Sequence, residues 1–121
     1  MDSGMFRALQ AAAVEALGNP PSWYDNVNSV YEKRRIIVEE IMNILKCSFD
    51  KNQSGLFVWG RIPDNIDSCE RFVDDILNNA HVFITPGFIF GSQGDRYIRI
   101  SLCAGETTLD EAKRRIRNYK P

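Results

Sequence analysis

The chain has 121 residues, of which 44% are apolar and 26% are charged, and its formal net charge at pH 7 is −1. This length suffices for one domain with a core of its own, or for one piece of a larger protein. With 15 basic and 16 acidic side chains, the sequence lacks the charge imbalance typical of proteins that bind nucleic acid or anionic membranes. No apolar run approaches the ~20 residues that span a bilayer, and the acidic start at Asp2 is unlike a signal peptide.

The cysteines and the histidine favour neither a disulfide framework nor a metal site. Cys47, Cys69 and Cys103 are odd in number and widely spaced, without a C-x-x-C pair. We expect three buried thiols and no metal, as in a protein of the reducing cytoplasm. His81 is the only histidine, so no histidine cluster is available for a metal.

Two helices are expected in the first part of the chain. From Met5 to Leu17 the apolar residues recur at helical spacing, with Asp2 or Ser3 able to cap the helix and Gly18 to end it. A second helix is expected from Ser22 to about Lys46, and its apolar stripe widens toward the C-terminal end. We therefore expect deeper burial there. At 1.5 Å per residue its ~25 residues make a rod of roughly 37 Å, longer than the core of a small domain requires.

A strand and a further helix follow. The run from Gly55 to Gly60 predicts a buried strand that ends before Pro63, with Phe57 and Trp59 as core aromatic residues. The segment from Asp67 to Glu70 has the pattern of a capping box. It precedes apolar residues at three-four spacing, which predict an amphipathic helix of about a dozen residues.

The last third predicts two strands and a helix. We expect a short strand from Val82 to Ile84, a loop from Phe88 to Asp95, and a second strand from Arg96 to Cys103, in which apolar residues alternate with others. A capping box from Thr108 to Glu111 predicts a final helix whose basic outer face is solvated. The order of elements predicts an α+β fold, with helices covering a small, mainly antiparallel sheet.

Arg99 is the strongest candidate for a functional side chain. It lies in the middle of the second strand of this pair, on the face opposite Ile98 and Ile100. A guanidinium carries five fixed donors and a permanent charge, which suit a carboxylate or a phosphate. A structural ion pair or a solvated surface position would explain the arginine equally well.

The segment from Thr85 to Leu102, TPGFIFGSQGDRYIRISL, resembles the end of the class I/II pyridoxal-phosphate-dependent aminotransferases of fold type I. In that family a V-x-x-x-P-G-x-x-F-G turn precedes a Y-x-R-[IL]-S strand. The arginine of the strand holds the α-carboxylate of the substrate. By this resemblance Arg99 is the carboxylate-binding residue.

Two earlier segments strengthen the resemblance. The long helix fits the family's Y-x-x-R-R signature at Tyr31, Arg34 and Arg35, and the strand fits a G-x-[FY]-x-W pattern that begins at Gly55. In the family that strand follows a loop lining the substrate entrance. Gly55 is thus a candidate for close approach of the backbone to the substrate.

The resemblance covers nearly the whole chain and implies three parts. Residues 1–20 would form the end of the large domain, residues 21–46 a long inter-domain helix, and residues 47–121 the small C-terminal domain. Ser3 and Gly4 loosely match a stretch that lies near the subunit interface and the neighbouring active site.

The Schiff-base lysine of the family has no counterpart among the five lysines, which are Lys33, Lys46, Lys51, Lys113 and Lys120. The resemblance therefore implies a C-terminal fragment of an aminotransferase that contributes the carboxylate-binding arginine. The complete enzyme would use pyridoxal phosphate, act on amino acids and 2-oxo acids, form a homodimer and lie in the cytoplasm. We expect this chain alone to bind no cofactor and to be inactive.

Two alternatives remain open. The first is a non-catalytic module in which the sheet and the Phe88–Asp95 loop bind a peptide or a small acid. The second is a fragment of a sister enzyme of the same fold, such as a C–S lyase or an amino-acid synthase-like protein. The residues present do not determine amino-acid specificity.

Overall fold

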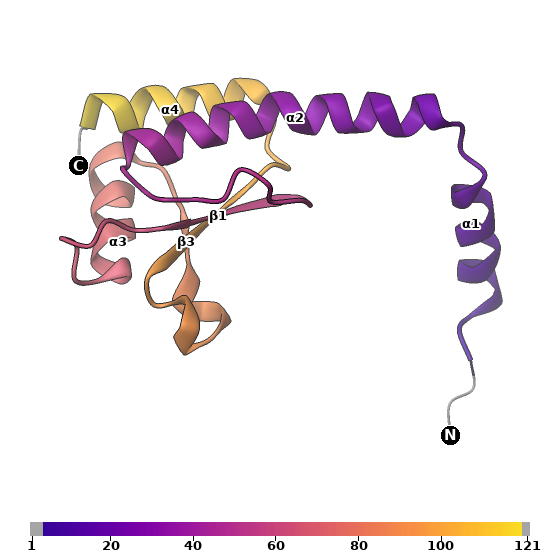
Figure 1. The fold of residues 1–121 in the computed structure, drawn as a ribbon, viewed down its shortest axis with the longest axis horizontal. Coiled ribbons are helices and arrows are strands. Elements are labelled where there is room, and N and C mark those ends of the chain that lie inside the picture. Colours follow the sequence, from indigo (N-terminus) through magenta and orange to yellow (C-terminus); the bar gives the residue numbers. More distant parts are fainter. Residues whose placement is uncertain (1–3, 120–121) are drawn as a thin grey trace. The chain divides into compact units, whose positions relative to one another are not determined.

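The structure, a computed structural model, describes residues 4–119 and confirms the α+β architecture (Figure 1). None of the helices in these residues has the length and apolarity needed to cross a membrane. In chain order the elements are α1 (Arg7–Leu17), α2 (Pro21–Ile44), β1 (Phe57–Arg61), α3 (Cys69–Ala80), β2 (Thr85–Pro86), the 3-10 turns η1 (Gly87–Phe90) and η2 (Ser92–Gly94), β3 (Tyr97–Ser101) and α4 (Glu106–Tyr119).

The chain divides into two compact units, one up to Val30 and one from Tyr31 onward. In the first unit, α1 has no buried residue, and its apolar side chains are exposed. The Tyr24 hydroxyl donates a hydrogen bond to the Ala16 carbonyl at 3.0 Å, which satisfies one carbonyl near the end of α1. This unit is therefore held by local contacts rather than by a core.

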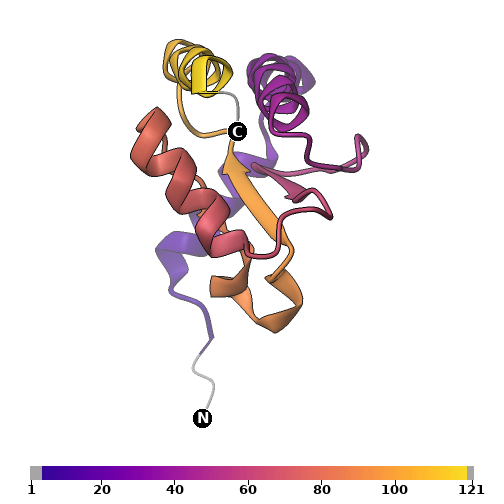
Figure 2. The same ribbon diagram turned by 90° about the vertical axis from the view of Figure 1, so that its left-hand side faces the viewer.

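The second unit contains a three-stranded antiparallel sheet in the order β1–β3–β2. Figures 1 and 2 show α4 beside the C-terminal half of α2, above the sheet. Successive side chains of a strand point to opposite faces, so Val58 of β1 and Ile98 of β3 face the helices and are almost fully buried. The α2 residues Val38, Ile41 and Met42 complete this core, as the widening apolar stripe predicts.

Arginines of α2 tie the helix to both ends of the sheet region. Arg34 donates to the Leu102 carbonyl at 3.0 Å, just after β3, and Arg35 donates to the Gly55 carbonyl at 3.1 Å, just before β1. These contacts explain why two adjacent arginines lie on a largely apolar helix. They fix the loops that lead into β1 and out of β3.

Four boundaries differ from those expected. α1 begins after Phe6, which stands at the N-cap position without a side-chain cap bond; the expected caps Asp2 and Ser3 lie outside the described residues. α3 is capped by the Ser68 hydroxyl, which accepts from the Arg71 N–H, rather than by the first residue of the box. α3 therefore begins at Cys69, one residue later than a cap at Asp67 would place it.

The other two differences concern β2 and α4. Pairing occurs at Thr85–Pro86 instead of at Val82–Ile84, because β2 is an edge strand, where a proline without an N–H is tolerated. α4 begins at Glu106, two residues before the expected cap Thr108, whose N–H donates to the Gly105 carbonyl at 3.1 Å. The first turn of α4 is therefore closed by backbone bonds to the Gly105 carbonyl, and Thr108 lies inside the helix.

The thiols differ in part from expectation. Cys47 and Cys69 are buried and free, but Cys103 is exposed, because it follows β3 at the open end of the strand. Burial raises the pKa of the Cys47 thiol to about 12, with a smaller contribution from Cys69. Burial also raises the pKa of Cys69. Both buried cysteines are therefore neutral apolar residues at physiological pH.

Candidate functional site

Arg99 lies at the centre of the uncovered face of the sheet. In the antiparallel register it is directly opposite Trp59 on one side and Thr85 on the other, and residues opposite each other share a face. Ile98 and Ile100 point the other way, toward the helices. The predicted facing of the arginine agrees with this register.

Two phenylalanine rings flank the Arg99 guanidinium. Its central carbon Cζ lies 4.0 Å from the centroid of the Phe57 ring and 4.1 Å from that of the Phe90 ring. The Trp59 ring is farther away, at 5.9 Å. Two rings this close to one carbon cannot share a position, so they approach from different sides. We call Phe57 and Phe90 the aromatic clamp.

The guanidinium has no acceptor within the part of the chain that the structure describes: no hydrogen bond or ion pair joins Arg99 to any residue of 4–119. Two nearby arginines, by contrast, do have acceptors. Arg61 forms a 2.8 Å ion pair with Asp64, and Arg96 donates to the carbonyls of Pro63 and Ile66. Arg99 is thus a half-buried cation whose donors remain available for an acidic ligand.

Hydrogen bonds along the outer edge of β1 fix the position of this strand, and therefore of Phe57, one of the two clamp residues. The side-chain amide of Gln53 accepts from the Trp59 N–H at 2.8 Å and donates to the Trp59 carbonyl at 2.9 Å. Because these backbone groups point away from β3, Trp59 and Arg99 form a non-hydrogen-bonded pair, the closer kind of cross-strand pair. The same outer edge is paired at Arg61 with the backbone of Ser48.

The other ring is placed by a contact between two glycines. A Cβ atom on Gly87 would lie 2.5 Å from the Gly94 carbonyl oxygen, and one on Gly94 would lie 2.1 Å from the Gly87 carbonyl oxygen. The turns η1 and η2 therefore touch backbone to backbone, which any side chain would prevent. Gly91, at φ +124°, reverses the chain between the two turns. Phe90 immediately precedes this reversal and packs edge to face on Trp59 at 5.3 Å.

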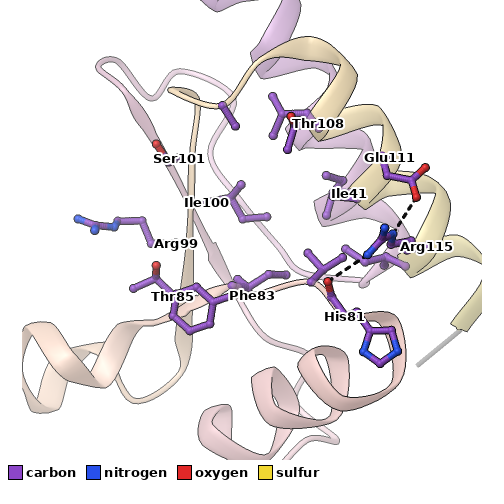
Figure 3. Close-up of a pocket in the computed structure, with 16 residues that line it drawn as sticks. Ile41, His81, Phe83, Thr85, Arg99, Ile100, Ser101, Thr108, Glu111 and Arg115 are labelled. Atoms are coloured by element: carbon purple, nitrogen blue, oxygen red, sulfur yellow. Dashed lines mark hydrogen bonds and ion pairs between the residues drawn. The ribbon is translucent and has the colours of Figure 1, made fainter.

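Two hollows border this strand. The larger, about 450 Å³, lies between the His81–Thr85 segment, β3 and α4, and is mostly apolar. Figure 3 shows that Arg99 lines it only at its margin, with the side chain pointing away from the hollow. The smaller, about 330 Å³, shares Trp59 and Phe90 with the surroundings of the guanidinium. The smaller hollow is thus the one nearer the arginine's charged group.

Comparison with known proteins identifies the family of this chain. The family model for aminotransferases of class I and II matches residues 3–116. The chain belongs to the class I and II aminotransferase family. Among curated relatives, an LL-diaminopimelate aminotransferase of Oleidesulfovibrio alaskensis is 37% identical over 116 residues, which cover 96% of this chain and 30% of that protein. The transaminase BacF of Bacillus subtilis is 35% identical, covering 93% of this chain and 29% of that protein.

Solved aminotransferase structures share the fold. The apo structure of BacF aligns with a TM-score of 0.75 at 34% identity, covering 98% of this chain and 30% of that one. An aromatic aminotransferase from Pyrococcus horikoshii aligns with a TM-score of 0.76 at 30% identity, covering 90% of this chain and 30% of that one. The chain therefore spans about 30% of the length of the relatives it matches.

The aminotransferase family implies pyridoxal phosphate in the complete enzyme, and the lysines among residues 4–119 do not fit the role of the Schiff-base lysine. That lysine must lose its proton. The Lys113 ammonium instead lies 2.7 Å from Asp110 and 2.8 Å from Glu40, and hydrogen bonds to these carboxylates raise its pKa. The other lysines of residues 4–119 are exposed, and none lines either hollow: Lys33, Lys46 and Lys51.

Of the remaining predicted site residues, Gly55 is the described residue that lies in the same unit as Arg99. Ser3 lies outside the described residues, and Gly4 belongs to the first unit, which is described separately. Gly55 lies in the loop before β1 at φ +88°, with open space where a Cβ atom would be. A glycine is favoured at this position by the positive φ of the backbone, and not by lack of space for a side chain.

The aromatic clamp was missed by sequence reasoning. Phe57 and Trp59 were expected in the core, but they lie on the open face, and Phe57 is 37% exposed. The alternation of residues along β1 could have indicated this exposure. Val58 and Gly60 occupy one face of β1 and are buried, so Phe57 and Trp59 must occupy the other. Phe90 lies outside any strand, so no periodicity indicates its contact with the arginine.

Proposed function

We propose that this chain is the part of a pyridoxal-phosphate-dependent aminotransferase that binds the α-carboxylate of the substrate, through Arg99. The complete enzyme would transfer an amino group between an amino acid and a 2-oxo acid. The observation that supports this most strongly is the half-buried guanidinium between two phenylalanine rings, on an open sheet face, without an acceptor in residues 4–119.

The role proposed for Arg99 is binding and orientation. A guanidinium can donate two parallel N–H···O bonds to one carboxylate, which fixes both the position and the plane of the acid group. With the carboxylate held in this way, the bonds at the neighbouring Cα point in set directions. Such positioning can supply a large share of a catalytic effect.

We further propose the division of the chain that the family resemblance implies. Residues 1–20 end the large domain, residues 21–46 form the inter-domain helix, and residues 47–121 form the small C-terminal domain. The 30% coverage of the relatives supports this proposal. The Schiff-base lysine and the cofactor site would then lie in other segments of a homodimeric enzyme, and this chain alone would be inactive.

The proposal is tested by replacing Arg99 with alanine in the complete enzyme. Truncating one partner of a hydrogen-bonded charge pair costs roughly 2–5 kcal/mol. We therefore expect kcat/KM for amino-acid donors to fall by about 30-fold to several thousandfold. Arg61→Ala is the matched control, because Arg61 lies on the same sheet face but is paired with Asp64. Its effect should be small.

If Arg99→Ala retained the kcat/KM of the unaltered enzyme, the assignment of the carboxylate to this residue would be wrong. Equal losses in the Arg99 and Arg61 variants would indicate a general effect of positive charge on this face, not a binding site. A sister lyase or synthase-like enzyme would show the same dependence on Arg99, but with elimination or condensation products instead of a 2-oxo acid.

A further inference from the structure

The two rings of the aromatic clamp are unusual in their exposure. Phe57 is 37% exposed and Phe90 is 51% exposed, so neither is buried in the core. They belong to elements far apart in the sequence, β1 and η1, yet both meet the same guanidinium. Core packing therefore does not account for their positions.

Contact with two rings changes what the arginine can do. The face of an aromatic ring is electron-rich and attracts a cation, whereas it offers no hydrogen bond to compete for the N–H groups. An unrestrained arginine loses considerable side-chain entropy when it binds a ligand, and pre-orientation removes part of that cost. A clamp of this kind thus restrains the guanidinium and leaves its donors free.

We propose that Phe57 and Phe90 are positioning residues that hold the Arg99 guanidinium ready for a planar carboxylate. This inference rests on the proposed function of Arg99. The clamp restricts the guanidinium to one orientation before the ligand arrives, so the carboxylate meets donors that are already aligned.

The surroundings of the clamp support a positioning role. The Phe90 ring packs edge to face against Trp59, with an interplanar angle of 69°. The Trp59 backbone in turn is held by two hydrogen bonds with the Gln53 side chain, one donated by each residue. The contact between Gly87 and Gly94 fixes the turn that carries Phe90. Each ring is therefore anchored through backbone contacts that do not involve the arginine.

The test uses nuclear magnetic resonance of the Arg99 Nε–Hε group in the 121-residue chain, with pyruvate, the simplest 2-oxo acid, as the ligand. Two nearby rings should displace this signal from its usual position. Phe57→Leu and Phe90→Leu should each move it back toward that position and weaken pyruvate binding by roughly two- to fivefold, since each ring contact is of the size typical of exposed cation–π pairs.

Matched variants separate positioning from a general structural effect. Phe57→Tyr keeps the ring face and should retain both the signal and the affinity. Tyr97→Leu removes another exposed ring from the same sheet face, one without a cation–π contact to Arg99, and should change neither. Unchanged thermal midpoints would show that the variants remain folded.

The outcomes distinguish the clamp from the site it serves. If the leucine variants keep the Arg99 signal and the pyruvate affinity, while Arg99→Ala loses binding, the clamp is overturned and the carboxylate site stands. If pyruvate leaves the Arg99 signal of the unaltered chain unchanged, the guanidinium is not held ready for a carboxylate and the clamp is overturned, whereas the carboxylate site is decided separately by Arg99→Ala in the complete enzyme. A loss of affinity in Phe57→Tyr equal to that in Phe57→Leu would also contradict the clamp.

Discussion

At the scale of single residues, Arg99 differs from the other arginines of the sheet region in what satisfies it. Arg61 pairs with a carboxylate, Arg96 donates to backbone carbonyls, and Arg34 donates to carbonyls after β3, although its Nε is buried without a hydrogen-bond partner in the described part of the chain. Arg99 meets only aromatic rings among residues 4–119. Whether an arginine on a strand can bind a ligand therefore depends on the groups around it, and not on its position in the alternation of apolar and polar residues.

Gly94 offers a test of the turn that carries Phe90. A Cβ atom there would lie 2.1 Å from the Gly87 carbonyl oxygen, which is backbone and cannot rotate away. We expect Gly94→Ala to destabilise the fold by about 1–3 kcal/mol, the usual cost of overpacking, as measured by urea unfolding.

Gly105→Ala is the matched control, because nothing lies within 4 Å of its Cβ position and its φ is not positive. Its unfolding free energy should change by less than about 1 kcal/mol. A stable Gly94→Ala protein would show that the two turns separate at little cost, and that Phe90 is not held in place by them.

At the scale of elements, the sequence predicted the four helices, the strands β1 and β3 and the order of the elements, because apolar periodicity records which face is buried. It predicted the facing of Arg99 for the same reason. It placed the β2 strand at Val82–Ile84 instead of at Thr85–Pro86. It did not predict that the Phe57 side of β1 is uncovered, since aromatic residues suit a core as well as an open face. Whether a face is covered depends on where the helices pack, which alternation within one strand does not record.

The sequence also predicted the first residues of some helices incorrectly, and α4 shows the reason. A threonine able to cap a helix was present at Thr108, but α4 begins two residues before it, at Glu106, and the Gly105 carbonyl accepts the first backbone bonds of the helix. Local side-chain signals compete with backbone solutions of similar free energy, so they locate the ends of elements less well than their interiors.

The Glu111 cluster gives α4 a testable dependence on pH. Hydrogen bonds from Arg114 and then Arg115 lower the pKa of this carboxyl to about 2. Because the folded-state pKa is lowered, the stabilisation is complete above the ordinary value of 4.5 and is lost as the pH falls toward 2. We expect Glu111→Gln to lower the thermal midpoint slightly at pH 7, and to have almost no effect at pH 2.

High salt should reduce the effect of Glu111→Gln at pH 7, since the carboxylate and its arginine partners lie at the surface, where ions screen them. Asp74→Asn is a suitable control, because Asp74 lies exposed on α3 and has no ion pair among residues 4–119. An effect of Glu111→Gln that persisted unchanged at pH 2 would show that its cause is not the charge.

At the scale of the whole molecule, the second unit holds a sheet with a helical layer on one face and Arg99 at the centre of the other. All of the chain's core residues lie in the second unit, and α1 buries none of its apolar side chains within this chain. The class I and II aminotransferase family, and a length near 30% of its relatives, are consistent with a part that works together with further segments. The proposed contribution of this part is carboxylate recognition.

The most direct test of that claim compares two donors in the complete enzyme: an amino acid, and the amine that lacks only its carboxylate. We predict that the unaltered enzyme strongly prefers the amino acid in kcat/KM, and that Arg99→Ala loses most of this preference while its activity on the amine changes little. If the preference remained intact in Arg99→Ala, another residue would bind the carboxylate, and the role proposed for Arg99 would be contradicted.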